Sequence, residues 1–273
     1  MSITQPIMKS SSFVQVEFNE QPVSIEYLWL NCESKKENND PVMIFLHEGL
    51  GSVAMWKDFP ETLCKSLNVK GLVYSRRGYG ESSARNPGEV LKPDFMHQEA
   101  FYFLPELLKV LKINSPPWLF GHSDGGSVAL LYASRFNVAG LIVLAPHTFV
   151  EEVTLCSIEK AGEAYVNTNL RARLSRYHAD VDSAFWGWNQ IWLNPEFRHW
   201  SIEEDIRTVT CPILAIQGVD DEYGSMLQIK NIAKNTPQTQ LLELSGCGHS
   251  PHRDQPEALI QACLEFFVTH LGY

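Results

Sequence analysis

A serine framed by glycines is the part of this sequence with the clearest chemistry. Residues 121–125 read GHSDG and fit the pattern G-x-S-x-G, in which a sharp turn between a strand and a helix exposes the serine hydroxyl. An apolar run, 118–120, leads into the turn, and a segment with helical spacing, 127–136, leads out of it. The glycines suit the turn because strand and helix crowd together there. We therefore expect Ser123 to act as a nucleophile.

A serine hydroxyl attacks only when a base removes its proton, and histidine suits that role because its pKa lies near neutrality. Of the nine histidines, His249 follows the last predicted strand and precedes the last predicted helix. That position lies at the carboxyl edge of a parallel sheet, where open α/β sheets bind ligands. We expect His249 to be the base and keep His252 as the second candidate. His122 should point away from the neighbouring serine, and His47 should be structural because it ends an apolar strand.

A carboxylate behind the histidine would fix its tautomer and stabilise its cation. Asp220 and Asp221 follow the apolar run 213–217 and Gly218, so both should lie on a loop that leaves a buried strand. The chain order serine, aspartate, histidine is the order that a strand-turn-helix serine motif of this kind requires. The residues by themselves leave both aspartates as candidates.

Attack on a carbonyl produces an oxyanion, which backbone N–H groups stabilise. We expect one N–H from Asp124, directly after the nucleophile. Another should come from Gly49 or Leu50, because the glycines of the loop 47–51 (HEGLG) allow a close approach to substrate. Glu48 and Asp124 also place two acids near this chemistry. One hypothesis is that one of them orients a cationic or hydrogen-bond-donating group of the substrate; the alternative is that both make only local hydrogen bonds.

The elements that must position these residues alternate between strands and helices. The first two runs alternate apolar and polar residues and predict an antiparallel pair at a sheet edge. The later runs are short and apolar, as in buried parallel strands, and the helical segments between them predict helices on both faces of the sheet. Pro105 should kink or split the second helical segment. The predicted strands are 14–18, 23–30, 42–46, 71–74, 118–120, 141–145, 213–217 and 241–244, and the predicted helices are 56–67, 95–111, 127–136, 226–235 and 256–271.

One stretch, 147–207, contains no strand-like run and is rich in aromatic residues. A structureless loop of that length inside a compact domain would be unusual, so we predict a helical cap. The chain then divides into a core, 1–146 and 208–273, and the inserted cap. Most of the aromatic side chains should pack a small core of the cap, and one or two should line an apolar pocket; they are Phe185, Trp186, Trp188, Trp192, Phe197 and Trp200.

The composition is that of a globular domain, with 44% hydrophobic and 20% charged residues. There are 32 Asp and Glu against 22 Lys and Arg, and the formal charge of -10 disfavours nucleic acid and anionic membranes as partners. The expected partner is a small-molecule substrate. No apolar run approaches the roughly 20 residues needed to span a bilayer, and the N-terminal stretch 1–18 lacks the apolar run of a secretory signal. We place the protein in the cytoplasm.

The cysteines are scattered and form no C-x-x-C pair. They indicate free thiols in a reducing compartment, instead of a zinc site or a disulfide framework. We expect neither a metal nor an organic cofactor, and the sequence leaves the oligomeric state open. The six cysteines are Cys32, Cys64, Cys156, Cys211, Cys247 and Cys263.

Together these motifs resemble the α/β-hydrolase superfamily, in particular its cap-bearing branch of small-molecule hydrolases, which includes carboxylesterases, meta-cleavage product hydrolases and proline iminopeptidases. The resemblance covers nearly the whole chain. Beside the serine motif, 47–49 (HEG) is similar to the family's His-Gly-x loop, and 75–82 (SRRGYGES) is similar to its Asp-x-Arg-Gly-x-Gly-x-Ser turn. Two positions depart from the pattern: Glu48 stands where the family has glycine, and Ser75 where it has aspartate.

The resemblance implies an α/β fold with a mostly parallel eight-stranded sheet, helices on both faces and a helical cap inserted after the sixth strand. It favours Asp221 over Asp220, because Gly-x-x-Asp is the family's spacing at that turn. The implied reaction is hydrolysis of a carboxylic ester through an acyl-enzyme. Carbon–carbon bond hydrolysis of a dienoic ketone acid is the nearest alternative, followed by thioester, lactone or N-terminal peptide cleavage. The non-enzyme alternative is an inactive binding protein on this fold, but such proteins usually lose a triad member and none is missing here.

Overall fold

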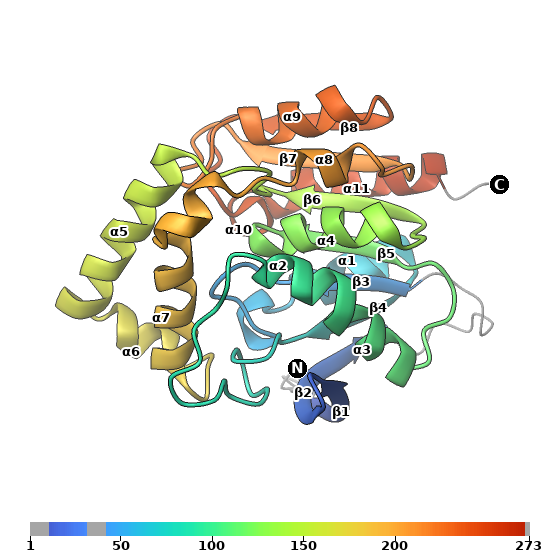
Figure 1. The fold of residues 1–273 in the computed structure, drawn as a ribbon. Helices are drawn as coiled ribbons and strands as arrows, with labels where there is room; N and C mark the ends of the chain where they lie inside the picture. Colours follow the sequence, from blue (N-terminus) through green and yellow to red (C-terminus); the bar gives the residue numbers. More distant parts are fainter. Residues whose placement is uncertain (1–10, 32–41, 271–273) are drawn as a thin grey trace, which may run out of the picture.

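Eight strands form one mixed sheet: β1 (Ser12–Phe18), β2 (Gln21–Leu30), β3 (Val42–Leu46), β4 (Lys70–Tyr74), β5 (Trp118–His122), β6 (Gly140–Leu144), β7 (Ile213–Gly218) and β8 (Thr239–Leu244) (Figure 1). This computed structural model describes residues 11–31 and 42–270. Cys32, the stretch 1–10 and residue 271, the predicted end of the last helix, lie outside the described residues.

The strand order is β1-β2-β4-β3-β5-β6-β7-β8. β1 and β2 pair antiparallel at one edge, as their alternating pattern predicts, and β2 continues antiparallel onto β4. From β4 to β8 every neighbouring pair is parallel. The predicted α/β fold with a mostly parallel eight-stranded sheet is confirmed.

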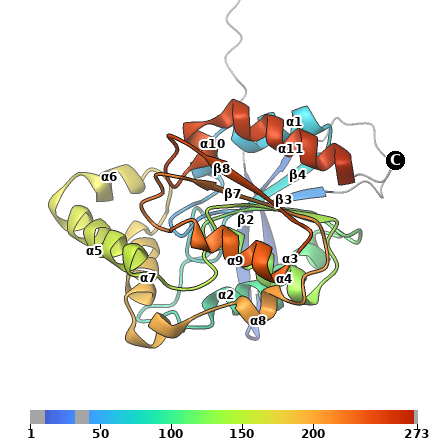
Figure 2. The ribbon, with the colours of Figure 1, turned by 90° about the horizontal axis from the view of Figure 1, so that it is seen from above.

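The helices are α1 (Phe59–Leu67), α2 (Phe95–Gln98), α3 (Leu104–Val110), α4 (Asp124–Arg135), α5 (Glu152–Asn167), α6 (Leu170–Leu174), α7 (Val181–Trp192), α8 (Glu203–Ile206), α9 (Leu227–Asn235), α10 (Pro251–Asp254) and α11 (Pro256–His270). Seen from above, α1, α10 and α11 cover one face of the sheet, and α2, α3, α4, α8 and α9 lie on the other (Figure 2). Each face buries its own apolar cluster. Because β5 and β6 are covered on both sides, all their residues are buried, which explains their continuous apolar sequences.

Three helices differ in extent from the prediction. The first begins only at Phe59, because Ala54–Trp56 forms a separate 3-10 turn. The second predicted helix is split, as Pro105 suggested: a π-helical turn, Glu99–Phe103, separates α2 from α3. Pro105 lies in the first turn of α3, directly after this π-helical turn. α4 begins at Asp124, three residues earlier than predicted, so this helix starts directly at the serine motif.

The segment between β6 and β7 is helical, as predicted. α5, α6 and α7 project to one side of the sheet in both ribbon views (Figures 1 and 2). Their aromatic side chains pack on one another: Phe185 stacks on Tyr165 with ring centroids 3.7 Å apart, and Trp192 meets Phe197 edge-on at 5.1 Å. α8 packs instead against α4 and α9. The projecting part therefore ends before α8, and the cap limits of 147 and 207 stay a prediction.

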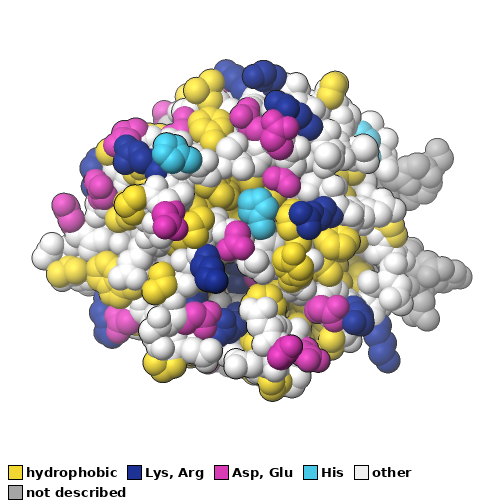
Figure 3. Space-filling view, viewed as in Figure 1, with side chains coloured by type: hydrophobic (Ala, Val, Ile, Leu, Met, Phe, Trp, Pro, Cys, Tyr) yellow, Lys and Arg dark blue, Asp and Glu magenta, His cyan; other side chains and the backbone are white. Residues whose placement is uncertain are grey.

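The surface carries charges of both signs. On the face in Figure 3, acidic and basic side chains are interspersed, and apolar side chains gather around a hollow near the middle. None of the described helices combines the length and the apolar content needed to cross a bilayer. Of the predicted free thiols, Cys156, Cys211, Cys247 and Cys263 are free.

Candidate active site

Ser123 sits in a strained turn between β5 and α4. Its φ is positive, 53°, with ψ at −120°, a backbone conformation that residues with side chains rarely adopt. The turn brings strand and helix so close that a Cβ on Gly121 would overlap the carbonyl of Gly125. A Cβ on Gly125 would overlap the carbonyl of Leu46 in β3. Glycine is required at both positions, which is why glycines frame the serine.

Three side chains from distant parts of the chain meet at the carboxyl edge of the sheet. The Oγ of Ser123 lies 3.0 Å from Nε2 of His249. The Nδ1 of His249 lies 2.8 Å and 3.0 Å from the two carboxylate oxygens of Asp221. The serine follows β5, the aspartate follows β7 and the histidine follows β8, so the parallel sheet positions all three. The arrangement is a continuous hydrogen-bonded line from hydroxyl to imidazole to carboxylate.

Asp221 is fixed by more than the histidine. Its carboxylate accepts hydrogen bonds from the backbone N–H of Tyr223 at 2.8 Å and from the side-chain amide of Gln217 at 3.1 Å. Burial raises the pKa of this carboxyl, but His249 and the Tyr223 N–H outweigh burial and keep the pKa below its ordinary value. Asp220 is exposed, and its side chain makes no hydrogen bond to the His249 ring. The structure thus brings Asp221, and not Asp220, to the histidine.

His122 and His252 do not bond the serine hydroxyl. The Nε2 of His122 donates to the backbone carbonyl of His249 at 2.7 Å, so this ring supports the loop that carries the proposed base. His252, the second candidate for the base, packs its buried ring against Trp56 with centroids 5.0 Å apart. Burial lowers the pKa of His252 to about 2. Neither ring occupies the place that His249 has beside Ser123.

Three backbone N–H groups near the serine are unpaired. Those of Gly49 and Leu50, in the loop after β3, and that of Asp124, the first residue of α4, have no hydrogen-bond acceptor among the described residues. The loop itself is tied down from two sides. The Nε2 of His178 donates to the carbonyl of Leu50 at 2.9 Å, and the guanidinium of Arg76 donates to another carbonyl of the loop at 2.9 Å. The predicted oxyanion donors therefore lie on rigid backbone and are free to bind.

Glu48 is paired with side chains of the protein itself. Its Oε1 accepts from Arg253 at 3.1 Å, and its Oε2 lies 3.5 Å from Nδ1 of His122. Burial raises the pKa of Glu48, but His122 and Arg253 outweigh it and hold the pKa well below its ordinary value. The neighbouring His47 donates from Nδ1 to the Glu48 carbonyl at 2.6 Å and accepts the Arg76 N–H at 3.0 Å. Glu48 makes the local contacts that were the alternative to orienting a substrate, and His47 is structural here.

Asp124 is the opposite case, a buried acid without a hydrogen bond. Its side chain is 1% exposed, and neither carboxylate oxygen has a hydrogen-bond partner. The guanidinium of Arg76 lies 4.0 Å from Oδ2, and burial raises the pKa of the carboxyl to about 6 although Arg76 and the nearby Trp192 side chain oppose the rise. A Cβ on Gly49 would come within 3.1 Å of Oδ2. The unpaired carboxyl therefore lies between the nucleophile and the loop after β3.

The turn after β4 explains why serine stands where the family has aspartate. Ser75 Oγ donates to Oε2 of Glu26 at 2.6 Å and accepts the backbone N–H of Val53 at 2.9 Å. The same Oε2 accepts the N–H of Glu81 at 3.0 Å. Glu26, on β2, thus supplies the carboxylate that the family has at position 75 of the turn.

A second histidine contacts the serine, and sequence reasoning missed it. The Nε2 of His147 lies 3.3 Å from Ser123 Oγ, and the buried ring meets Trp192 edge-on with centroids 4.8 Å apart. The prediction made His147 only the first residue of the cap. Its position three residues after Leu144, the end of β6, was the available signal. Because β6 neighbours β5, the two loops leave the same sheet edge side by side.

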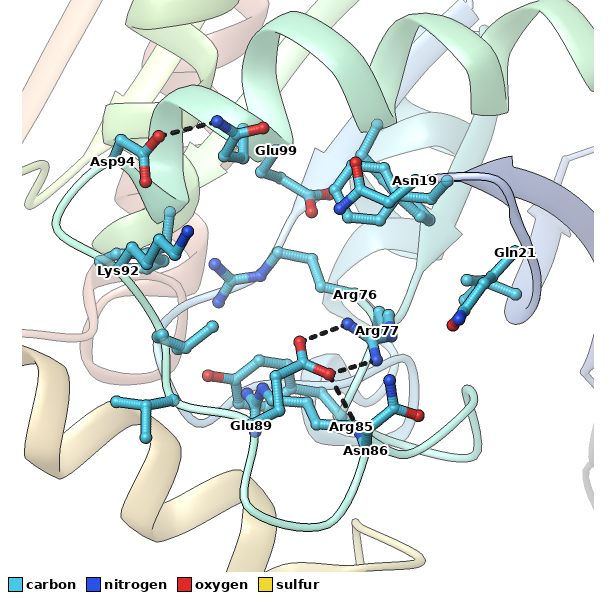
Figure 4. Close-up of a pocket in the computed structure, with 18 of the residues that line it drawn as sticks. Asn19, Gln21, Arg76, Arg77, Arg85, Asn86, Glu89, Lys92, Asp94 and Glu99 are labelled. Carbon is cyan, nitrogen blue, oxygen red and sulfur yellow. Dashed lines mark hydrogen bonds and ion pairs between the residues drawn. The ribbon is translucent and has the colours of Figure 1, made fainter.

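A cavity of about 780 Å³ lies beyond Arg76, and neither Ser123, His249 nor Asp221 lines it. It lies between the β1–β2 turn, the loop after β4 and the start of α2, and Arg76 extends into its middle (Figure 4). Arg77, Arg85 and Lys92 also line it, and Arg77 makes two hydrogen bonds to Glu89, at 2.5 Å and 2.6 Å. Arg76 separates the cavity from the loop after β3. Neither here nor elsewhere in the described residues do three His, Cys, Asp or Glu side chains gather as a metal site would require.

Comparisons with known proteins point to one fold. A family model described as the alpha/beta hydrolase family matches residues 43–262. Protein phosphatase methylesterase 1 from Bos taurus is 29% identical to this chain over 119 residues. That match covers 43% of this chain and only 30% of the relative.

Solved structures agree over a larger part of the chain. A carboxylesterase from the thaumarchaeon Nitrososphaera gargenis superposes with a TM-score of 0.73 at 18% identity, covering 94% of this chain and 98% of the other. A proline iminopeptidase from Mycobacterium smegmatis has a TM-score of 0.71 at 18% identity, with 95% and 98% covered. Identities this low show a common fold and no more. Because the family model matches most of the sequence, the chain belongs to the alpha/beta hydrolase family.

Proposed function

We propose that the chain is a serine hydrolase that cleaves a small-molecule carboxylic ester through an acyl-enzyme. The observation that carries the proposal is the continuous contact from Asp221 through His249 to Ser123, with 2.8 Å and 3.0 Å between the nearest bonding atoms. A nucleophile, a base and a carboxylate in this order are what acyl transfer by serine requires.

The proposed reaction has two halves that use the same groups. Ser123 Oγ attacks the ester carbonyl while its proton passes to Nε2 of His249. Asp221 keeps the other proton on Nδ1 and stabilises the imidazolium. The imidazolium then gives its proton to the departing alcohol, which leaves the acyl group on the serine. Water, deprotonated by the same histidine, cleaves that ester and restores the enzyme.

The negative charge of each tetrahedral intermediate needs donors that are in place beforehand. We assign this role to the N–H of Asp124 and to that of Gly49 or Leu50, because all three are unpaired and lie beside the serine turn. Donors on rigid backbone stabilise the oxyanion without reorganising during the reaction.

The sequence relative named above favours an ester over the other substrates of this fold. It is a methylesterase by its name, and the match covers 43% of this chain. An ester is also the simplest substrate for this set of groups, which needs no cofactor for acyl transfer.

The test is a substrate panel run beside the Ser123→Ala variant. It contains p-nitrophenyl esters of increasing acyl length, thioesters, lactones, N-terminal peptide amides and a vinylogous ketone acid. We expect an ester to be turned over fastest, and Ser123→Ala to lower kcat by about 10⁶-fold, the scale of triad removal in another serine hydrolase. Unchanged ester turnover in Ser123→Ala would contradict the proposal. Absence of turnover of every substrate by the wild type would also contradict it and would favour an inactive binding protein.

We further propose that Asp124 favours substrates with a cationic or hydrogen-bond-donating group near the scissile bond. Its two carboxylate oxygens have no hydrogen bond, whereas those of Glu48 are paired with Arg253 and His122. Amino-bearing and neutral esters of equal size should be compared on the wild type, on Asp124→Asn and on Glu48→Gln. The preference for the amino ester should fall in Asp124→Asn and persist in Glu48→Gln. Equal turnover of both esters by all three enzymes would count against this role.

Arg76 favours a second candidate, carbon–carbon bond hydrolysis of a ketone acid. Such a substrate carries a carboxylate that must be bound, and the guanidinium of Arg76, 4.0 Å from the carboxylate of Asp124, places a positive charge beside the residue that follows the nucleophile. If this candidate holds, the vinylogous ketone acid should be the fastest substrate of the panel, and Arg76→Met should raise its KM more than that of a neutral ester.

A further inference from the structure

The serine hydroxyl has two imidazole neighbours, and the proposed function uses only one. Ser123 Oγ lies 3.0 Å from Nε2 of His249 and 3.3 Å from Nε2 of His147. A hydroxyl carries a single hydrogen, so it can donate a hydrogen bond to only one of these rings and must accept a hydrogen bond from the other.

The contact with Asp221 decides which ring is the donor. Because Nδ1 of His249 faces a carboxylate at 2.8 Å, Nδ1 carries the hydrogen of that ring and Nε2 is bare. The serine hydrogen therefore points to His249. Both contacts are hydrogen bonds only if Nε2 of His147 carries a hydrogen and donates it to Ser123 Oγ.

His147 is suited to remain a neutral donor and unsuited to be a base. It is 2% exposed, and its Nδ1 has no hydrogen-bond partner among the described residues. Within the described part of the chain, no carboxylate contacts Nδ1 of this ring as Asp221 contacts Nδ1 of His249. Burial, together with the charge of His249, lowers the pKa of His147 to about 3. The two histidines thus differ in what their Nδ1 atoms contact.

The local backbone holds His147 against the nucleophile. Ala145, two residues earlier, has a φ of 44°, a strained value for a residue other than glycine. The N–H of His147 donates to Ser127 Oγ at 3.1 Å, and Ser127 Oγ donates to the His147 carbonyl at 2.6 Å. Ser127 lies in α4, the helix that begins directly after Ser123. One helix therefore positions both the nucleophile and the second histidine.

We propose that His147 is a catalytic residue that donates its Nε2–H to Ser123 Oγ during both halves of the reaction. This proposal rests on the proposed function. Before attack, this bond keeps the serine hydrogen directed at His249. When the bond between Oγ and the carbonyl carbon forms, the serine proton moves to His249. When that bond breaks in deacylation, its electron pair returns to Oγ and His249 returns the proton. His147 keeps its own hydrogen throughout and stabilises the charge that gathers on Oγ.

The test compares two replacements of similar length. His147→Gln keeps an N–H donor at the end of the side chain, and His147→Met removes it. The rate of labelling by a fluorophosphonate is measured for both variants and for the wild type. Thermal denaturation of each protein shows that it is folded. We expect His147→Met to be labelled roughly 10- to 100-fold more slowly, as when one donor to a developing charge is removed, and His147→Gln to recover most of that loss. Wild-type labelling by His147→Met, or equal slowing of both variants, would overturn the proposal.

A measurement on the unaltered protein keeps the proposal testable if a variant does not fold. Nitrogen-15 NMR of the histidine rings distinguishes a hydrogen on Nε2 from one on Nδ1. We expect His147 to be neutral with its hydrogen on Nε2 at pH 7, and its signal to shift when Ser123 carries the fluorophosphonate. A hydrogen on Nδ1, or a charged ring at this pH, would overturn the proposal.

The outcomes separate this proposal from the function on which it rests. If Ser123→Ala still hydrolyses esters, the serine mechanism is wrong. If Ser123→Ala is inactive while His147→Met keeps wild-type labelling and turnover, the serine mechanism stands and only the role of His147 is wrong.

Discussion

Two buried polar clusters lie at the carboxyl edge of the sheet, and they are built in opposite ways. In the turn after β4, Ser75 donates to Glu26 and accepts from Val53, and Glu26 accepts a further N–H from Glu81. Around Ser123, no hydrogen-bond partner among the described residues reaches the carboxylate oxygens of Asp124, the Nδ1 of His147 or three nearby backbone N–H groups.

The difference separates what holds the fold from what is available for chemistry. A buried polar group left without a partner costs about 1–3 kcal/mol, so clusters that serve stability are fully bonded. A site that binds substrate leaves positions open for the substrate and the transition state to occupy. Changes in the turn after β4 should therefore lower stability with little effect on kcat. Changes around Ser123 should lower kcat without lowering stability.

The largest effect is expected from Asp221→Asn. An amide in this place would favour the wrong tautomer of His249, so kcat should fall by about 10⁴-fold, the scale of the same change in another serine hydrolase. The measurement is steady-state turnover of the best ester of the panel. Asp220→Asn is the matched control on the same loop and should keep wild-type turnover. Equal losses in the two variants would contradict the assignment of Asp221.

The next largest effect is a pH-dependent change in stability from Asp124→Asn. Burial raises the pKa of Asp124 from 3.8 to about 6, so the folded state holds this proton more tightly than the unfolded state. The stability linked to this group is fully present below about pH 4 and is lost as pH rises through 6. The asparagine variant does not titrate, so its unfolding free energy relative to the wild type should rise by about 2 kcal/mol between pH 4 and pH 7.

Urea denaturation of both proteins across this pH range checks the expectation. A difference in unfolding free energy that stays constant with pH would show that Asp124 has an ordinary pKa. In that case the carboxyl has a partner in solution, and the contrast with the turn after β4 would be lost.

A smaller effect is expected in the fully bonded turn. Ser75→Ala removes the hydroxyl that donates to Glu26 and leaves the buried N–H of Val53 without an acceptor. The unfolding free energy should fall by about 1–3 kcal/mol, while kcat stays within about twofold of the wild type. Ser66→Ala, on the exposed side of α1, is the control and should change stability by less than about 0.5 kcal/mol. A large loss of kcat in folded Ser75→Ala would place this turn in the chemistry.

The fold was predictable from the sequence because local pattern and tertiary structure agree in the core. β5 and β6 read as continuous apolar runs since helices cover both of their faces. The positions of Ser123, His249 and the pair Asp220 and Asp221 followed from the same pattern, because residues after parallel strands meet at one edge of the sheet. The choice of Asp221 came from the resemblance to the family.

What the sequence did not reveal depends on side-chain partners across the sheet. Glu26 completes the turn around Ser75 from a strand 49 residues away, and nothing local marks that pairing. Glu48 and Asp124 looked alike as acids near the nucleophile, yet Glu48 accepts a hydrogen bond from Arg253, whereas Arg76 lies 4.0 Å from Asp124 without a hydrogen bond. His147 was assigned to the cap because no strand pattern surrounds it, although β6 ends three residues before it.

The most direct test of the central claim is to locate a fluorophosphonate label by mass spectrometry. Attack by Ser123 with His249 as base predicts one label per chain, on the peptide that contains Ser123. Labelling should be greatly slowed in His249→Ala and should keep the wild-type rate in His252→Ala. A protein that takes up no label, or carries it on another residue, or is labelled equally fast without the His249 ring, would contradict the account.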